Sequence, residues 1–360
     1  MYAETICMSP LGMHQASDKA SQARKPMRWR NGIAFVSALF ICACAAGDKS
    51  QAQAMPKPDW SLSDMPSQQG RIVLITGGSS GIGYEAAKAI AGGGARVIIA
   101  SRNEARAQEA IAKIRMDVPN AQVEFEELDL ASLASVQALS ERLSSTLPHI
   151  DVLINNAGVM EPPVRELSAD GYEMQFAVNY LGHFALTQKL LPLLQQAPAP
   201  RIVSLSSIAA RQGTINFADL HYKNYDSFDA YSQSKLACLI FARELQRRSL
   251  ESGWGVTSIA THPGVSRTDL LINRGGLNGF MRRNFTFMFQ PADRGALPTI
   301  YAATAPDAQA GAYYGPTGMM ETRGELGLAE VPQAATDEQT AAHLWAISEE
   351  LANVRYPSQQ

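Results

Sequence analysis

The chain has 360 residues, of which 46% are hydrophobic and 18% charged, a composition typical of a globular protein with a sizeable core. Its 31 basic and 34 acidic residues give a net charge of -3 without a long basic run, which argues against a nucleic-acid partner. Cys7, Cys42 and Cys44 precede the part that reads as folded, which leaves Cys238 inside it and excludes a disulfide framework.

The first predicted segment, residues 1–66, is a leader separate from the folded domain. A basic flank, "RKPMRWRN", precedes the apolar run "GIAFVSALFICACAA" and a polar exit, a pattern typical of a signal peptide and short for a membrane span. Met27 is an alternative start, and "ICAC" resembles a bacterial lipoprotein box with Cys44 as the lipidated residue. The open alternatives are a cleaved signal, an interfacial membrane anchor, and a disordered or untranslated leader.

Six short β-branched runs then alternate with longer helical patterns. They are "RIVLITGG", "ARVIIASR", "VEFEELDL", "DVLINNAG", "RIVSLSS" and "VTSIATHPG". Their nearly continuous apolar residues indicate strands buried on both faces, and each gap is long enough for a crossover helix. The sequence therefore predicts an α/β fold over residues 67–357, a single Rossmann-type doubly wound parallel sheet with helices on both faces.

The first run ends in a glycine-rich turn, "TGGSSGIG", at residues 76–83. Gly77, Gly81 and Gly83 allow a tight turn and bring backbone amides and a helix N-terminus close to a diphosphate, whose negative charge the helix dipole favours. The spacing has one more residue between the first two glycines than the usual GxGxxG. We expect a dinucleotide site here, with an ordinary turn as the alternative.

The end of the second run selects the cofactor. Enzymes that use NAD place an acid there for the ribose hydroxyl, whereas this chain has Ser101 and Arg102. A guanidinium suits a 2'-phosphate, which favours NADP(H). If Arg102 is instead a solvated loop residue followed by Glu104, NAD(H) is the cofactor.

The next runs end in small and polar residues. Asp129, in "LDLAS", is a candidate for a helix N-cap. "NNAG" at 155–158 allows a close approach of the cofactor, or forms an ordinary turn. Ser206 and Ser207 follow the fifth run at a strand's carboxyl end, where ligands bind in open α/β sheets, with simple turn residues as the alternative.

Tyr231 and Lys235 lie four residues apart in "AYSQSKLACLIF", so both side chains share one helical face. A phenol alone is a poor base near neutral pH, and a neighbouring ammonium favours the phenolate. The pair is therefore a candidate for proton transfer, while the same spacing also suits packing.

Taken in this order, the glycine turn, "NNAG", Ser207 and the YxxxK pair resemble the short-chain dehydrogenase/reductase family, most of all its retinol dehydrogenase and WW-domain oxidoreductase-like branch. The likeness covers roughly residues 68–355 and includes "VNYLGHF" around Asn179. It implies that Asn179 holds a water linking Lys235 to solvent, although from the residues alone Asn179 is a buried amide satisfied by backbone. It implies no metal and the following cofactor contacts: Gly77, Ser79, Ser80, Gly81, Ile82, Gly83, Arg102, Asp129, Leu130, Asn156, Ala157, Gly158, Tyr231, Lys235, Pro263, Gly264, Val265 and Thr268.

The implied activity is NADP(H)-dependent interconversion of an aldehyde or ketone and its alcohol, with Asn179, Ser207, Tyr231 and Lys235 as the catalytic set. Tyr231 exchanges the proton, Ser207 binds the carbonyl oxygen while Ser206 is expected to point elsewhere, and Lys235 tunes the phenol. Cofactor supply favours a cytoplasmic or membrane-associated domain working as a reductase. The alternatives are a non-catalytic NADP-binding regulator of the same fold and an exported envelope protein.

Residues 271–290 match no pattern that we can name. Their apolar side chains suit a small hydrophobic substrate, or are partly buried in a homo-oligomer interface. They are Phe280, Met281, Phe285, Phe287, Met288 and Phe289.

Overall fold

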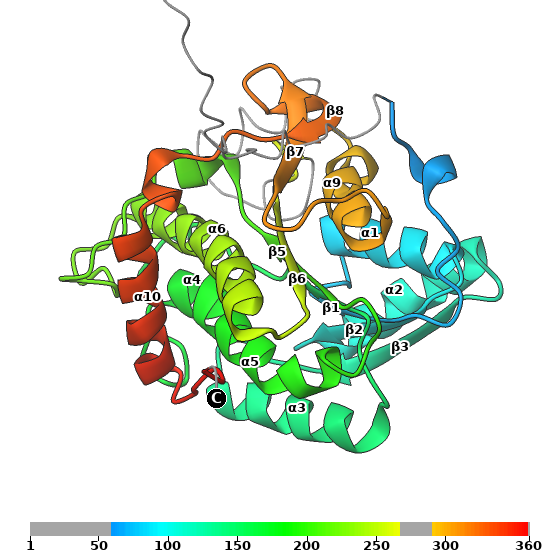
Figure 1. Ribbon diagram of the computed structural model, residues 1–360, viewed down its shortest axis with the longest axis horizontal. Coiled ribbons are helices and arrows are strands. Elements are labelled where there is room, and N and C mark those ends of the chain that lie inside the picture. Colours follow the sequence, from blue (N-terminus) through cyan, green and yellow to red (C-terminus); the bar gives the residue numbers. More distant parts are fainter. Residues whose placement is uncertain (1–58, 267–289, 359–360) are drawn as a thin grey trace, which may run out of the picture. The chain divides into compact units, whose positions relative to one another are not determined.

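The computed structural model describes residues 59–266 and 290–358, which fold around one eight-stranded sheet in the order β3-β2-β1-β4-β5-β6-β7-β8 (Figure 1). The neighbouring pairs from β3 to β7 are parallel, and β8 runs antiparallel to β7. The strands are β1 Ile72–Thr76, β2 Arg96–Ser101, β3 Gln122–Glu127, β4 Val152–Asn155, β5 Arg201–Leu205, β6 Thr257–Thr261, β7 Tyr313–Gly318 and β8 Arg323–Leu328. The predicted doubly wound fold is confirmed.

Helices cover both faces of the sheet. The longer ones are α1 Gly81–Gly92, α2 Glu104–Asp117, α3 Leu133–Thr146, α5 Gly182–Leu194, α6 Ser227–Ser252, α9 Ala292–Thr304 and α10 Glu338–Leu351. The short ones are the 3-10 helices η1 Leu62–Asp64, η3 Ile208–Gln212 and η5 Gln333–Ala335, the single turn α4 Met174–Phe176 and the π-helical turn η2 Ala177–Leu181.

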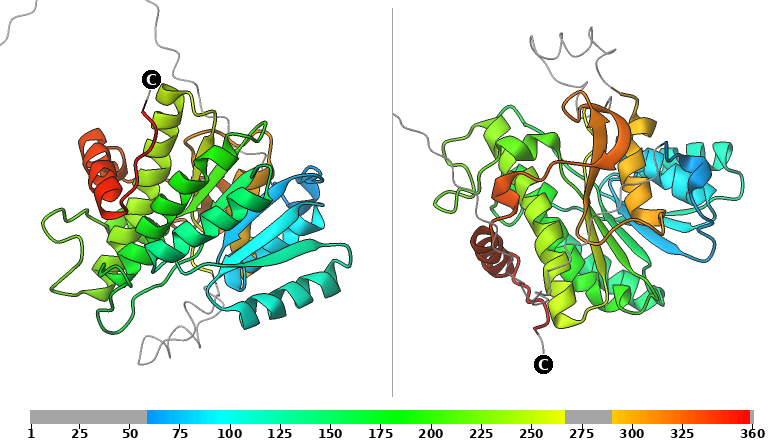
Figure 2. Two further views of the ribbon diagram at one scale, coloured as in Figure 1. Left: turned by 90° about the horizontal axis from the view of Figure 1, so that it is seen from below. Right: turned by 45° about the horizontal axis from the view of Figure 1, so that its top comes forward.

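Two hydrophobic clusters lie on opposite faces of the sheet, because successive strand residues point to opposite sides. In β1, Leu74 joins the cluster under α3, α5, α6 and α10, while Ile75 joins the cluster under α1, α2 and α9. All five β1 residues are buried, as expected for a central strand covered on both faces. Helix α9 packs between α1 and the β7–β8 end of the sheet (Figure 2).

The last two strands were not among the six predicted runs. β7 reads "YYGPTG" and β8 "RGELGL", and the glycines and Pro316 in them are typical of turns. The hairpin tolerates them because the ladder is irregular between Pro316 and Gly318. Long-range pairing with β6, rather than local propensity, makes this segment a strand.

The packed domain begins earlier than the predicted boundary at 67. Trp60 is buried and its ring meets Tyr301 of α9 edge-on, with 5.3 Å between the ring centroids. Residues 59–66 therefore belong to the packed domain. The sequence did not predict this, because a tryptophan followed by polar residues gives no local sign that it will be buried. The rest of the predicted leader lies outside the described residues. Within residues 59–266 and 290–358, no helix combines the length and apolarity needed to span a membrane.

Candidate active site

A cavity of about 880 Å³ opens at the carboxyl ends of the parallel strands. It is lined by the residues that follow β1 to β6, by the first turn of α1, and by Tyr231 and Lys235 of α6. This is the crevice in which open α/β sheets bind ligands. Among the described residues, every predicted site residue except Asn179 lines this cavity. Thr268 and the apolar stretch 271–289 lie outside the described residues.

The glycine turn after β1 has no room for a side chain at Gly77 or Gly83. Gly77 has a φ of +68° and Gly81 of +56°, a region that favours glycine. A Cβ on Gly77 would lie 2.8 Å from the Cα of Ala157, and one on Gly83 would strike the Asn156 amide and the Gly77 carbonyl. The turn therefore presses against the loop after β4 and leaves the first turn of α1 facing the cavity.

Asn156 secures this contact. Its Nδ2 donates to the carbonyl oxygens of Thr76, at 2.8 Å, and Gly77, at 3.3 Å. Thr76 Oγ1 in turn accepts from the backbone amides of Asn156 and Ala157, both at 3.0 Å. The side chain of Asn156, a predicted cofactor residue, thus connects the end of β1 to the end of β4.

Two arginines line the cavity at the end of β2. Arg102 was predicted, whereas Arg106, one turn into α2, was not. Asn103 caps α2 by accepting from the Arg106 amide at 2.9 Å, so the helix starts at the cavity wall. The sequence signal that could have identified Arg106 was its place in the first turn of the helix that follows Arg102.

Asp129 lines the cavity but does not cap a helix, so the N-cap alternative was wrong. The N-cap of α3 is Ser132, whose hydroxyl accepts from the Ser135 amide at 3.3 Å. Asp129 Oδ1 instead accepts from the Ala131 amide at 2.9 Å, in the turn before the helix. The correction is physical: the N-cap must stand directly before the first helical residue, and Asp129 is four residues away from Leu133.

Helix α6 places Tyr231 and Lys235 on the cavity wall. Asp226 caps the helix by accepting from the amides of Phe228 and Asp229, at 2.9 and 2.8 Å. Tyr231 and Lys235 are 6% and 4% exposed, so both polar ends are held in a largely water-excluded site. Lys235 Nζ donates to the carbonyl oxygen of Leu205 at 3.1 Å, which ties the ammonium to the end of β5.

The two serines after β5 point in different directions. Ser206 is buried, and its Oγ donates to the carbonyl oxygen of Lys235 at 2.7 Å. Ser207 lines the cavity, and its Oγ accepts from the Ala209 amide at 3.2 Å as the N-cap of η3. Because that oxygen is oriented by the backbone, the hydroxyl proton remains to be donated.

Asn179 is 2% exposed and acts as a brace. Its Oδ1 accepts from the Val159 amide at 2.7 Å, and its Nδ2 donates to the Val159 carbonyl at 2.9 Å and to Ser234 Oγ at 2.8 Å. The side chain thereby joins the loop after β4 to α6 beside the cavity, from a π-helical turn of a kind frequent at functional sites. Its water-holding role stays a prediction.

The loop after β6 brings Pro263, Gly264 and Val265 to the cavity. Gly264 has a φ of +61°, and the Val265 amide donates to the Thr322 carbonyl at 2.7 Å. The β7–β8 hairpin therefore carries part of the same wall.

Several lining residues beyond this loop were missed by sequence reasoning. Val159 and Met160, directly after "NNAG", and Phe228, one helical turn before Tyr231, had a local signal, whereas the others lie outside the predicted motifs. The missed residues are Val159, Met160, Arg211, Gln212, Phe228, Met320 and Thr322.

Comparisons with known proteins agree with this geometry. The family model for "short chain dehydrogenase" matches residues 71–275. Retinol dehydrogenase 12 of Mus musculus is 39% identical over 290 residues, which are 80% of this chain and 88% of that protein. The crystal structure of an uncharacterised protein from Mycobacterium paratuberculosis matches with a TM-score of 0.69 and 38% identity, covering 83% of this chain and 99% of that one. A short chain dehydrogenase from Escherichia coli CFT073, complexed with NADPH, matches with a TM-score of 0.54 and 25% identity over 69% of this chain and 97% of that one.

Proposed function

The chain belongs to the short-chain dehydrogenase family, in its retinol dehydrogenase-like branch, and on that premise we propose that it interconverts a hydrophobic aldehyde or ketone and its alcohol with NADP(H). Membership makes it an NAD(P)-dependent oxidoreductase acting on CH-OH groups. One observation carries the finer proposal: a single cavity is lined by the glycine turn, two arginines, Ser207, Tyr231 and Lys235.

The fit of a dinucleotide is supported by the shape of the turn after β1. Gly77 and Gly83 let the turn pack closely against the loop after β4, and the first turn of α1 offers amides and a positive dipole end to a diphosphate. The loop at Pro263–Val265 would hold the nicotinamide end, near Lys235. When bound, the dinucleotide supplies or accepts a hydride at its nicotinamide ring.

The preference for NADP(H) rests on charge at the end of β2. Arg102 and Arg106 both line the cavity there, and a guanidinium binds a phosphate with charge-assisted hydrogen bonds. Asp129, the one acidic residue among the described lining residues, follows β3 instead of β2. This supports recognition of a 2'-phosphate over a ribose hydroxyl pair. The relative from Escherichia coli CFT073 is a complex with NADPH.

The chain's own groups would handle the proton. As the carbonyl oxygen gains negative charge, the Tyr231 hydroxyl donates its proton to that oxygen, and the Ser207 hydroxyl donates a hydrogen bond to it. The Lys235 ammonium, held 3.1 Å from the Leu205 carbonyl, favours the phenolate that Tyr231 becomes. Alcohol oxidation is the same sequence reversed, with the phenolate accepting the proton.

A hydrophobic substrate is supported by the apolar part of the cavity lining. Val159, Met160, Ile208, Phe228 and Met320 contribute apolar side chains to the cavity that Ser207 and Tyr231 also line. Pockets of this kind bind ligands through apolar surface and orient them with a few polar groups. Methionine adapts to ligands of different shape, so we expect tolerance among aldehydes and ketones of one size class.

The test is NADPH oxidation by the full chain against a panel of aromatic and aliphatic aldehydes and ketones. Tyr231→Phe removes the hydroxyl and should lower kcat by about 10²- to 10⁴-fold, the usual contribution of general acid catalysis, while NADPH still binds. Tyr222→Phe, a partly buried phenol outside the cavity, is the matched control and should keep full activity. Equal rates for the two variants would refute the role of Tyr231 in proton transfer. NADPH binding without turnover of any carbonyl would favour a non-catalytic regulator.

A further inference from the structure

Glu321 lies in the turn of the β7–β8 hairpin, in an unusual backbone conformation. Met319, Met320 and Glu321 have φ values of 44°, 56° and 62°, a region that non-glycine residues seldom adopt. Three such residues in a row are costly, so the surrounding contacts must hold them there. The residues on either side of Glu321, Met320 and Thr322, line the cavity. The strained turn is therefore part of the cavity wall.

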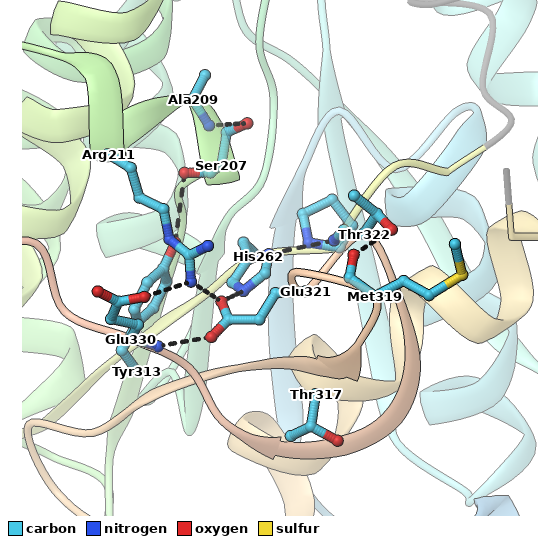
Figure 3. Close-up of polar contacts among 12 residues, drawn as sticks. Ser207, Ala209, Arg211, His262, Tyr313, Thr317, Met319, Glu321, Thr322 and Glu330 are labelled. Carbon is cyan, nitrogen blue, oxygen red and sulfur yellow. Dashed lines mark hydrogen bonds and ion pairs between the residues drawn. The ribbon is translucent and has the colours of Figure 1, made fainter. Parts of the chain in front are cut away.

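The Glu321 carboxylate joins three separate segments (Figure 3). Its Oε2 accepts from His262 Nε2 at 3.0 Å and from Arg211 Nη2 at 2.7 Å, while its Oε1 accepts from the Glu330 amide at 2.8 Å. Arg211 Nη2 also lies 3.3 Å from Glu330 Oε2. The Glu321 side chain is 14% exposed, so these charge-assisted contacts are shielded from much of the solvent.

His262 connects Glu321 to the loop after β6. Its side chain is fully buried, and its Nδ1 accepts from the Gly264 amide at 3.2 Å. Since Nδ1 accepts, the ring proton is on Nε2, which donates to Glu321. Burial lowers the pKa of His262, which agrees with a neutral ring. A Cβ at Gly315 would strike the ring, so β7 is shaped to admit it.

We propose that Glu321 is a positioning residue that sets the cofactor loop, the serine segment and the substrate wall relative to one another. Through His262 it orients the Gly264 amide, in the loop assigned to the nicotinamide end. Through Arg211 it holds η3, whose N-cap is Ser207. Through its own backbone it places Met320 and Thr322. The inference deepens the proposed function and rests on it.

Glutamine cannot replace this carboxylate, although the two side chains have the same shape. If the glutamine oxygen faces His262 and Arg211, its amide nitrogen faces the Glu330 N-H, and two donors meet. If the amide nitrogen faces His262, the ring must move its proton to Nδ1, which then meets the Gly264 N-H. Either orientation leaves a donor facing a donor in a site with little water.

The experiment compares Glu321→Gln with Glu325→Gln in the full-length protein. Glu325 lies exposed on β8 of the same hairpin, and its hydrogen bond with Thr317 uses the backbone carbonyl. We measure the Kd for NADPH by fluorescence, and kcat and KM for a carbonyl that the wild type reduces. We expect kcat to fall about 10- to 100-fold in Glu321→Gln, as for a small misplacement of reacting groups, with the NADPH Kd nearly unchanged. The glycine turn and Arg102 belong to other segments than the contacts of Glu321, so they keep the cofactor bound.

His262→Asn supplies the second arm of the test. An asparagine oxygen can still accept from the Gly264 amide as an Asx turn, so this variant removes mainly the link to Glu321. The double variant should then lose no more kcat than the worse single variant, because both changes break one link. Should Glu321→Gln fail to fold, the kcat and Kd of His262→Asn decide the matter by the same criterion.

The outcomes separate the two proposals. A wild type that reduces carbonyls, together with a Glu321→Gln variant equal to Glu325→Gln, overturns the positioning role alone. Additive losses in the double variant also overturn it, and so does an NADPH Kd that rises in step with the loss of kcat. A wild type that binds NADPH but reduces no carbonyl overturns the proposed function, and the positioning role falls with it.

Discussion

His183 should make the folded protein lose stability as the solution becomes acidic. Its ring is buried between Thr76 Oγ1, at 2.8 Å from Nε2, and the carbonyl oxygen of Asn179, at 2.9 Å from Nδ1. The carbonyl accepts only, so the proton is on Nδ1 and Nε2 accepts from the Thr76 hydroxyl. A second proton on Nε2 would displace the Thr76 hydroxyl, which helps to hold the Asn156 and Ala157 amides.

The magnitude follows from the shift in pKa. Burial lowers the pKa of His183 from 6.5 to about 4. Between those values the unfolded chain binds a proton that the folded chain does not, so the free energy of unfolding falls as pH drops below 6.5. At pH 5 the linkage relation gives a loss of about 2 kcal/mol relative to neutral pH. Well above pH 6.5 the ring is neutral in both states, and the full stability is present.

The assay is urea unfolding at pH 7 and pH 5, followed by tryptophan fluorescence, for the wild type and His183→Gln. The wild type should lose about 2 kcal/mol more than the variant over this interval, since glutamine does not titrate. His343→Gln is the control, because His343 is exposed and stacked on Phe217. It should lose as much as the wild type. If His183→Gln shows the same pH dependence as the wild type, the argument from burial is refuted.

Two further changes test the cofactor end of the cavity. Arg102→Ala should raise the KM for NADPH about tenfold or more and leave that for NADH nearly constant, because one charge-assisted contact to a 2'-phosphate is lost; equal effects on both cofactors would argue against the assignment. Gly83→Ala should abolish binding of either cofactor, because its Cβ would strike the Asn156 amide and the Gly77 carbonyl. Calorimetric titration measures that loss, and Gly92→Ala, where a Cβ has open space apart from a contact at 3.9 Å with Val118, is its control.

The parts of this protein that could be predicted are those whose cause is local. The buried strands are recognisable in the sequence as β-branched runs. The turn at Gly77–Gly83 is recognisable because a positive φ and a close backbone approach require glycine. Position in an alternating pattern also placed Ser207 at a strand end, and helical spacing placed Tyr231 and Lys235 on one face. These inferences need only the chain's own periodicity and the geometry of a parallel sheet.

Where local marks compete, the sequence was not enough. The sequence offered Asp129 as a helix N-cap, whereas the structure gives that role to Ser132, directly before Leu133. Trp60 gains its burial from Tyr301, 241 positions later, and "YYGPTG" becomes a strand only beside β6. For Trp60 and "YYGPTG" the deciding partner is distant in the chain, so no short window contains it.

By itself the sequence determined the doubly wound sheet, the glycine cradle and the polar set Ser207, Tyr231 and Lys235, because each depends on residue type at fixed spacing. The tertiary structure decided what surrounds that set. The side chain of Asn179 forms hydrogen bonds with Val159 and Ser234. Arg106 lines the cavity together with Arg102. Glu321 meets His262 and Arg211 from a hairpin at the far end of the sheet. A carboxylate finds such partners only after β6, β7 and η3 have packed together, and no pattern along the chain encodes that meeting.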